Sequence, residues 1–348
     1  MLAAYVARPA IVHGAHKIST AEILDDIRAH HPDHPKLGVF LRAVANCGVS
    51  YRHFTRPLAM VTATRGVKER NRAAFDDSLD MAERAALQAL EGTGLRPDDI
   101  DAIITSHTTS WQVPQLDIAL MGRLGLRRDI HRLPLATLAC AGGAQALILA
   151  RNHLKTIPGG RILVVVAEDL SSIYHHSDAE IQHMAYKALF GCSAGAVIVT
   201  DAPTGPGFVL GDSFEHVLPE IDGIRRYWGR LDAEGLHFDS TRAAARAAAD
   251  ALPYLTEWMG GWRPDFAAIH TGGPGIIADV ARALDLTPHD ARHSVASLDE
   301  SGNLGGVAVF DVLDRTLDDP PADGADGLLV AFGPGFVTAA CKITARSS

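Results

Sequence analysis

The stretch that decides the fold runs from Leu133 to Leu154 and reads LPLATLACAGGAQALILARNHL. An apolar run leads to Cys140, a glycine pair follows at Gly142 and Gly143, and the remainder has the spacing of a helix. A thiol at the start of a helix has its thiolate favoured by the helix dipole and by unpaired N–H groups. A buried cysteine is more commonly a small packing residue. The surrounding pattern has to decide between these two interpretations.

A second copy of this joint lies further along the chain. The segment ACAGGAQALILARNHL corresponds to GNLGGVAVFDVLDRTL, which places Cys140 and Asn303 163 residues apart. Arg-Pro-Asp precedes an apolar run at residues 96–98 and again at 263–265, an offset of 167, and the runs beginning at 162 and 328 are 166 apart. Such near-equal offsets predict two α/β halves of one topology about a pseudo-twofold axis. Cys140 and Asn303 should then face each other at the centre.

Apolar runs and helical patterns alternate along the whole chain, which predicts an α/β protein with buried strands. The expected strands are 100–108, 161–169, 195–201, 266–272 and 327–333, and the expected helices are 78–91, 115–124, 142–155, 241–259 and 276–284. His107 and His270 are near-equivalents at the ends of paired strands, where open α/β sheets carry their ligands. We expect one half over residues 1–212, with the nucleophile, and the other over 213–348, with the histidine and asparagine.

Composition excludes several classes of protein. The chain has 348 residues, is 47% hydrophobic and 21% charged, and carries a net charge of −9, so no broad basic surface for nucleic acid is expected. No apolar run reaches the roughly 18 residues of a membrane span, and no signal-peptide pattern opens the sequence, so we expect a cytoplasmic protein without membrane partners. The four cysteines lie far apart without CxxC spacing, which argues against disulfides and zinc. Five histidines in polar surroundings are interpreted as solvated surface without a role: His30, His31, His34, His175 and His176.

Cys140, His270 and Asn303 offer a nucleophile, a base or oxyanion donor, and a neutral hydrogen-bond donor. This set suits acyl transfer from a thioester. Papain-like proteases use the same three residue types in the same order. Their C-G-[SA]-C-[WY] motif is absent here, and a protease would leave the duplication without an explanation.

The motifs together resemble the thiolase superfamily and, within it, the bacterial form of the type III polyketide synthases, the chalcone and stilbene synthase family. LACAGGAQAL resembles the nucleophile segment, ALFGCSAGAVIV the region after the third strand, IHTGGPGII the histidine loop, SGNLGGVAV the asparagine loop and AFGPGF the C-terminal loop. The FGPG element distinguishes the type III polyketide synthases from the other members of the superfamily. Ketosynthase III enzymes usually lack it, thiolases replace the asparagine with a second cysteine, and HMG-CoA synthases use a glutamate base.

The resemblance implies a five-layered αβαβα thiolase fold and a homodimer. It also implies that a starter acyl-CoA acylates Cys140, whose thiolate pairs with His270. His270 and Asn303 would stabilise the enolate that forms when malonyl-CoA loses carbon dioxide. Repeated Claisen condensation would then build a chain that cyclises to a pyrone, resorcinol or phenol, without a metal or redox cofactor.

The resemblance further assigns a substrate pocket and a coenzyme A site. Phe190 and Phe238 would flank the cysteine. The expected pocket residues are Thr109, Trp111, Leu170, Ile173, Phe190, Gly229, Phe238, Gly305, Phe332, Gly333, Pro334 and Gly335. Arg52 and Arg56 lie where relatives carry basic residues, so they are expected either to bind coenzyme A phosphates or to be ordinary surface arginines.

Several positions depart from the family pattern. The family usually carries the motif Leu-Phe-Gly-Asp-Gly, and in this sequence Cys192-Ser193 replaces its Asp-Gly pair. We expect Cys192 to be a packed thiol. Gly305, where plant enzymes often have serine, should leave extra room, and Trp111 should either narrow the cavity or fill the core. Leu170 and Ile173 replace threonines of plant enzymes and predict a more apolar pocket. Two alternatives remain open: a ketosynthase III-like enzyme that makes one condensation, with or without a carrier protein, and a thiolase-fold partner with a dead site.

Overall fold

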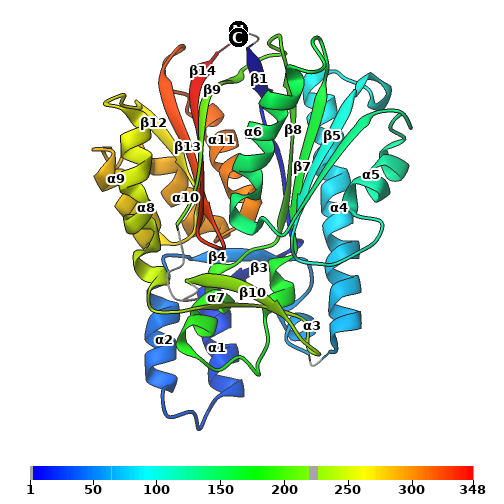
Figure 1. Ribbon diagram of the computed structural model, residues 1–348. Coiled ribbons are helices and arrows are strands. Elements are labelled where there is room, and N and C mark those ends of the chain that lie inside the picture. The colour runs from blue at the N-terminus through cyan, green and yellow to red at the C-terminus, as the bar shows by residue number, and fades with distance from the viewer. Residues whose placement is uncertain (1–2, 64, 219–225, 348) are drawn as a thin grey trace.

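The computed structural model describes residues 3–63, 65–218 and 226–347. Its upper part has five layers, helix, sheet, helix, sheet and helix, as the family resemblance implies (Figure 1). The central layer consists of α6 (Gly142–Leu154) and α11 (Ala308–Asp318), the two helices of the duplicated joint. Helices α4 (Val67–Thr93) and α5 (Leu116–Leu124) cover one outer face. The opposite face is covered by α8 (Ala244–Met259), α9 (Pro274–Ala283) and α10 (Arg292–Ser301).

The two sheet layers each contain strands of one half of the chain. The N-terminal layer consists of β1 (Ala4–Ala7), β2 (Ala10–His13), β8 (Ser193–Thr200), β7 (Ile162–Glu168), β5 (Ala102–His107) and β6 (His131–Ala136). The C-terminal layer consists of β12 (Phe266–Ile269), β13 (Asp326–Gly333), β14 (Val337–Arg346) and β9 (Gly207–Val217). Every residue of β7 and β8 is buried, because helices cover both faces of these strands.

The two layers are joined into one sheet of ten strands, because β1 pairs antiparallel with both β8 and β9. Strand β9 runs across the expected boundary between residues 212 and 213, so the chain passes between the halves within a strand. The division into residues 1–212 and 213–348 stays a prediction.

The two helices of the duplicated joint begin at positions whose separation in the sequence differs from the 163 residues between Cys140 and Asn303. The short 3₁₀ turns η2 (Ala139–Ala141) and η5 (Gly305–Val307) precede α6 and α11, and both pairs of elements are offset by 166 residues. Cys140 therefore lies within its turn, whereas Asn303 lies two residues before the equivalent turn. The two side chains meet, as described below, but they do not occupy equivalent positions.

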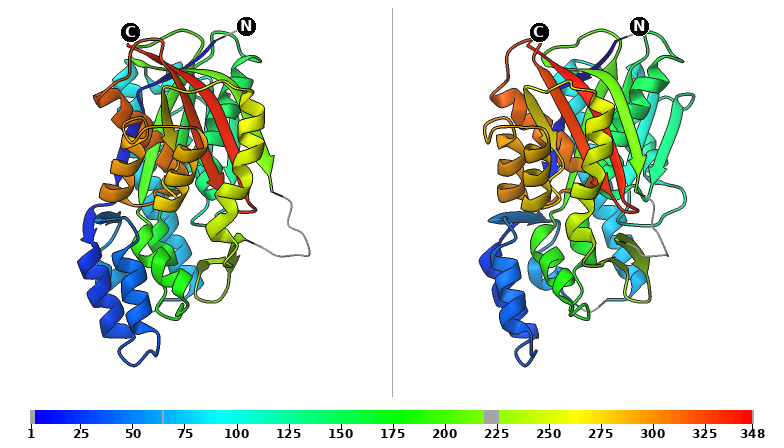
Figure 2. Two further views of the ribbon diagram at one scale, coloured as in Figure 1. Left: turned by 90° about the vertical axis from the view of Figure 1, so that its left-hand side faces the viewer. Right: turned by 60° about the vertical axis from the view of Figure 1, so that its left-hand side comes forward.

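A smaller part lies beneath the five layers and was not predicted from the sequence. Its N-terminal helices form a hairpin that projects at the lower end in Figure 2, next to α7. The elements of this part are β3 (His16–Ser19), α1 (Thr20–His30), α2 (Leu37–Ala45), β4 (Tyr51–Phe54), α3 (Leu58–Val61), η3 (Leu170–Ile173), α7 (Ile181–Leu189), β10 (Tyr227–Leu231) and β11 (Leu236–Ser240). In the part of the chain that the structure describes, no helix is long and apolar enough to cross a membrane.

Candidate active site

Cys140 lies at a sharp turn between strand β6 and helix α6. Thr137 and Ala139 adopt positive φ angles of 63° and 46°, a conformation that side chains with a Cβ rarely adopt. The backbone N–H of Ala139 is held by the hydroxyl of Thr108, at 2.9 Å. Cys140 is 5% exposed and forms part of η2. A strained, hydrogen-bonded turn thus fixes the sulfur at the start of the helix.

The glycine pair after Cys140 allows the two halves to approach closely. A Cβ at Gly143 would lie 2.1 Å from the carbonyl oxygen of Gly306, on the turn that begins α11. A Cβ at Gly306 would in turn lie 2.9 Å from the carbonyl oxygen of Ala139. Real Cβ atoms do not tolerate such distances, so glycine is required where the duplicated joints cross.

His270 and Asn303 reach the same point from the other half. His270 directly follows β12, and its backbone N–H donates to Val330 at 2.9 Å. Its Nε2 lies 3.2 Å from Asn303 Oδ1, and Asn303 Nδ2 lies 3.9 Å from Cys140 Sγ. The N–H of Gly305 also donates to Asn303 Oδ1, at 2.9 Å. Since Oδ1 accepts this bond, the amide directs its N–H₂ group toward the sulfur, and His270 Nε2 donates to Oδ1 whenever it carries a proton.

Burial controls the protonation of this site. Desolvation raises the pKa of Cys140 to about 12, with the bond from Asn303 opposing the shift, and lowers the pKa of His270 to about 4. Each group alone is therefore neutral at pH 7. A thiolate can form only if another group at the site takes the thiol proton.

Glu168 is a third titratable group near the sulfur that the sequence analysis missed. Desolvation raises its pKa to about 7, although the backbone N–H groups of Thr108 and Thr109 both donate to its Oε2 at 3.1 Å. Its other oxygen, Oε1, is buried without a partner among the described residues. The available signal was its position at the carboxyl end of an all-apolar strand in ILVVVAE, where α/β sheets place functional side chains.

Four of the predicted pocket residues gather beside the turn of Cys140. Leu170, Ile173, Phe190 and Phe238 form one buried apolar cluster with Ala139. The rings of Phe190 and Phe238 are 6.1 Å apart, and Tyr227 stacks on Phe238 at 5.3 Å. Gly229 pairs with Phe238 across strands β10 and β11. These side chains form an apolar, partly aromatic wall beside the turn of Cys140, and their role in holding substrate stays a prediction.

The C-terminal loop is only partly as expected. Gly333 lies against the nucleophile turn, since a Cβ there would be 2.8 Å from the Cβ of Ala141, and the N–H of Gly335 donates to Tyr227 at 3.2 Å. Pro334 lies between them. The assignment of Phe332 to the pocket is wrong, because its side chain stacks on Phe336 within the core of the C-terminal half.

Thr109 and Trp111 line a cavity of about 240 Å³ between α4, the ends of β5 and β6, and β11. Trp111 is 75% exposed at its rim, so of its two expected roles, filling the core is wrong, and narrowing the cavity stays a prediction. Cys140 is not among the described residues that line this cavity. Gly305 does not create the extra room near the active site that the sequence led us to expect. A Cβ there would meet Leu170 at 3.2 Å and Glu168 at 3.4 Å, and its φ of +60° explains the glycine.

Arg52 is not available for phosphate binding. Its side chain is fully buried, and its guanidinium donates to the carbonyl oxygens of Ala188 and Ile18 and to the hydroxyl of Thr20. It therefore joins β4 to α7, to strand β3 and to the first residue of α1. Arg56 is 31% exposed and forms two hydrogen bonds with Asp77, at 2.7 and 3.0 Å. A role of Arg56 in phosphate binding stays a prediction.

Two other sequence expectations have a clear structural outcome. Cys192 is buried; its thiol donates to Asp169 Oδ1 at 3.0 Å and accepts from the N–H of Ser171 at 3.2 Å. Burial raises its pKa well above the usual range, as for a packed thiol. The interpretation of His175 as solvated surface is wrong, since it is 2% exposed and its Nε2 bonds to Leu236.

Comparison with known proteins agrees with this geometry. Profiles of the N-terminal and C-terminal domains of chalcone and stilbene synthases match residues 55–203 and 212–345. A 1,3,6,8-tetrahydroxynaphthalene synthase of Streptomyces griseus is 31% identical over 96% of this chain and 90% of its own. A phloroglucinol synthase of Pseudomonas fluorescens is 30% identical, with coverage of 94% and 95%.

Solved structures show the same likeness. The crystal structure of 1,3,6,8-tetrahydroxynaphthalene synthase from Streptomyces coelicolor superposes with a TM-score of 0.93 at 29% identity and covers 99% of this chain and 100% of that one. Germicidin synthase of the same organism gives a TM-score of 0.89, also at 29% identity, with coverage of 99% and 100%. The chain belongs to the chalcone and stilbene synthase family and is a type III polyketide synthase, an acyltransferase with the thiolase fold.

Proposed function

We propose that Cys140 carries the growing acyl chain, that His270 and Asn303 stabilise the enolate of malonyl-CoA, and that the product is a polyhydroxylated aromatic compound. The observation that carries the role assignment is the placement of the Asn303 amide between the imidazole and the sulfur. The product class is supported by the relatives, whose names specify a tetrahydroxynaphthalene and phloroglucinol.

The chemistry follows from this arrangement. The thiol proton moves to His270, and the thiolate takes an acyl group from an acyl-CoA or malonyl-CoA starter, with free CoA as the leaving group. When malonyl-CoA binds, its terminal C–C bond breaks, carbon dioxide leaves, and the electron pair becomes an enolate. N–H donors on His270 and Asn303 stabilise the enolate oxygen. The enolate carbon then attacks the thioester carbonyl, the C–S bond breaks, and the chain leaves on CoA to reload Cys140.

The apolar cluster of Phe190 and Phe238 supports an iterative reaction. A chain held by the sulfur lies next to buried apolar side chains and not in open solvent, which protects a reactive polyketide from hydrolysis. Neither a metal nor a redox cofactor takes part in any of these steps. We further propose that the enzyme acts as a homodimer, as the family resemblance implies, and light scattering on the purified protein measures this directly.

Purified protein incubated with malonyl-CoA, alone and with a panel of acyl-CoA starters, tests the proposal. We expect carbon dioxide release and products extended by more than one malonyl unit, detected by mass spectrometry. Cys140→Ala should form no extended product. A single extension with every starter would favour the ketosynthase III-like alternative. No carbon dioxide release from the wild-type protein, together with no preferential alkylation of Cys140 by iodoacetamide, would show that the site is dead.

A further inference from the structure

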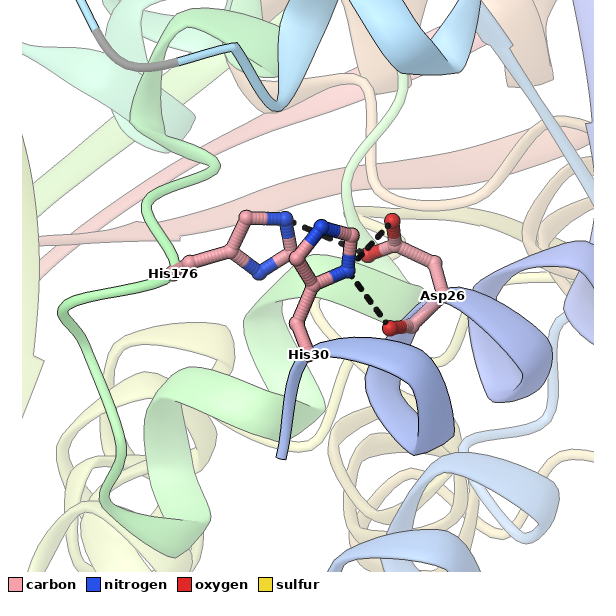
Figure 3. A group of neighbouring side chains, drawn as sticks. All are labelled: Asp26, His30 and His176. Carbon is pink, nitrogen blue, oxygen red and sulfur yellow. Dashed lines mark hydrogen bonds and ion pairs between the residues drawn. The ribbon is translucent and has the colours of Figure 1, made fainter. Parts of the chain in front are cut away.

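Three ligand-type side chains meet between helix α1 and the segment that follows η3 (Figure 3). Asp26 and His30 lie one turn apart on α1, so they share one face of the helix. His176 approaches from the other segment, and its ring stacks on that of His30 with centroids 3.7 Å apart. His30 Nδ1 is 3.3 Å from Asp26 Oδ1, and His176 Nε2 is 3.7 Å from Asp26 Oδ2. We refer to Asp26, His30 and His176 as the lower cluster.

These distances suit a shared cation. Zinc binds histidine nitrogen and carboxylate oxygen at about 2.0–2.2 Å in a tetrahedron, which places neighbouring ligand atoms roughly 3.3 Å apart. One ligand atom from each member of the lower cluster lies within 4.8 Å of the others, so small side-chain rotations complete the geometry. The side chains of Asp26 and His176 are 9% and 20% exposed, whereas that of His30 is 46% exposed. One side is thus open for entry of the ion and for a water as fourth ligand.

The lower cluster also contains polar atoms that the protein leaves unsatisfied. Both ring nitrogens of His176 are buried without a hydrogen-bond partner among the described residues. Buried polar atoms without partners are rare in folded proteins and destabilise them, and a bound cation would supply a partner for one of these two nitrogens. Asp26, in contrast, is already oriented, because the Tyr174 hydroxyl donates to its Oδ2 at 2.5 Å. Such hydrogen bonds to a ligand are typical of metal sites.

The contacts of His30 decide which of its ring nitrogens can bind the ion. His30 Nδ1 lies 2.9 Å from the backbone oxygen of Asp26 as well as near its carboxylate. Nδ1 can act as the ligand only with its lone pair free, so the ring then carries its hydrogen on Nε2.

A neighbouring group lacks these features. His175, Glu234 and His237 also lie close together, but His237 is bonded at both ring nitrogens, to Asp178 at 2.8 Å and to Asp232 at 3.0 Å. His175 Nε2 is bonded to Leu236. This second group is satisfied by the protein itself and serves as an internal comparison.

We propose that Asp26, His30 and His176 bind one divalent transition-metal ion, with zinc the best match to this ligand set. The ion ties α1 to the segment after η3, the turn that carries Leu170 and Ile173 of the apolar cluster. Its role is structural, and the condensation chemistry does not depend on it. The cysteine spacing argued against zinc, and the ligands here are imidazoles and a carboxylate instead.

Calorimetric titration of the untagged, chelator-treated protein with ZnCl₂ tests this site. We expect one ion per chain, a Tm raised by zinc, and, with CoCl₂, the visible absorption of a tetrahedral cobalt site. His176→Ala and His30→Ala should each weaken binding at least tenfold. Tyr174→Phe, which removes only the hydroxyl on Asp26, should weaken it about tenfold. Thermal unfolding without metal shows whether each variant still folds.

Two matched controls make the outcome decisive. His34→Ala changes a histidine in the same stretch whose Nδ1 accepts a bond from the backbone of Lys36, and it should bind zinc as the wild type does. His175→Ala changes the second group and should also bind normally. Absence of saturable binding, equal affinity in wild type and a folded His176→Ala variant, or loss of the ion in His175→Ala alone would each overturn the proposal.

Discussion

Phe190 and Asn303 form an isolated parallel bridge between two segments that are far apart in the sequence. The N–H of Asn303 donates to Leu189 at 2.7 Å, and the N–H of Gly191 donates to Asn303 at 3.0 Å. The backbone that presents the amide near Cys140 is therefore the same backbone that places the Phe190 ring beside the turn of Cys140. The Asn303 amide and the apolar cluster that contains Phe190 are therefore positioned together by one pair of backbone segments.

Removal of the Asn303 side chain should separate decarboxylation from acylation. The amide donates near the sulfur but does not take the thiol proton, so Asn303→Ala should lower carbon dioxide release from malonyl-CoA by about 10²–10³-fold. Transfer of an acyl group from a starter CoA to Cys140, followed by intact-protein mass spectrometry, should continue. Lost acylation with normal carbon dioxide release would contradict the assigned roles.

The pH dependence of alkylation should reveal the partner of the Cys140 thiolate. With His270 present, the proton moves within the site, so the rate of iodoacetamide inactivation should change little between pH 6 and 8. In His270→Ala, the thiol must lose its proton to solvent with a pKa raised by burial to about 12. The rate should then rise about tenfold per pH unit up to the alkaline limit of stability. A wild-type profile with that same steep slope would mean that His270 is not the proton acceptor.

Substitution of Gly143 should disrupt the contact between the halves. Gly143→Ala places a methyl group against the backbone of Gly306, and since backbone cannot move aside, we expect a loss of at least 2 kcal/mol of stability or failure to fold. Gly122→Ala is the matched control in another helix, with nothing within 4 Å of the added carbon. It should leave Tm unchanged or raise it, because alanine favours helix by about 1 kcal/mol. Equal effects would show that the close approach is not limiting.

The residue that the family usually carries at position 192 should not be tolerated here. Cys192→Asp would place a second carboxylate next to the buried Asp169. Burial already raises the pKa of Asp169. Repulsion would raise the folded-state pKa values of the pair above their unfolded values, so stability should fall as pH rises from 5 to 8. Cys192→Ser keeps a donor and should show little such dependence. Thermal melts across this pH range distinguish the two, and a pH-independent Tm for the aspartate variant would contradict the prediction.

The central fold and the reactive side chains were predictable because their signals are local or repeated. The expected strands 161–169 and 195–201 correspond to β7 and β8 within two residues at each end, and the pseudo-repeat brought Cys140 and Asn303 to one point. The expected helix 78–91 in fact begins at Val67. Its first turns were missed because VKERN is rich in charge and carries no apolar stripe. Its buried face appears only from Ala74 onward, apart from Arg70.

Tertiary partners decided the features that the sequence analysis missed. Arg52 is buried because carbonyl groups from residues 18 and 188 converge on it, and neither is near it in sequence. The sequence around Phe332 does not show which side of its strand faces the substrate pocket. Its place in the core of the C-terminal half follows only from its stacking on Phe336. The histidines near residues 30 and 176 look solvated separately, and they form a cluster only when α1 meets the segment after η3.

The pairing of β1 with both β8 and β9 sets an order for biosynthesis. Residues 4–7 leave the ribosome before both of their hydrogen-bonding partners, which lie at 193–200 and 207–217 and are made about 190 residues later. At 5–20 residues per second, that strand waits roughly 10 to 40 seconds with exposed edges. Contacts of such high sequence separation form late in folding. Strand β1 is thus made before both of its partners and is among the last of the described strands to be paired, which makes it the point where a chaperone or a truncation would act most strongly.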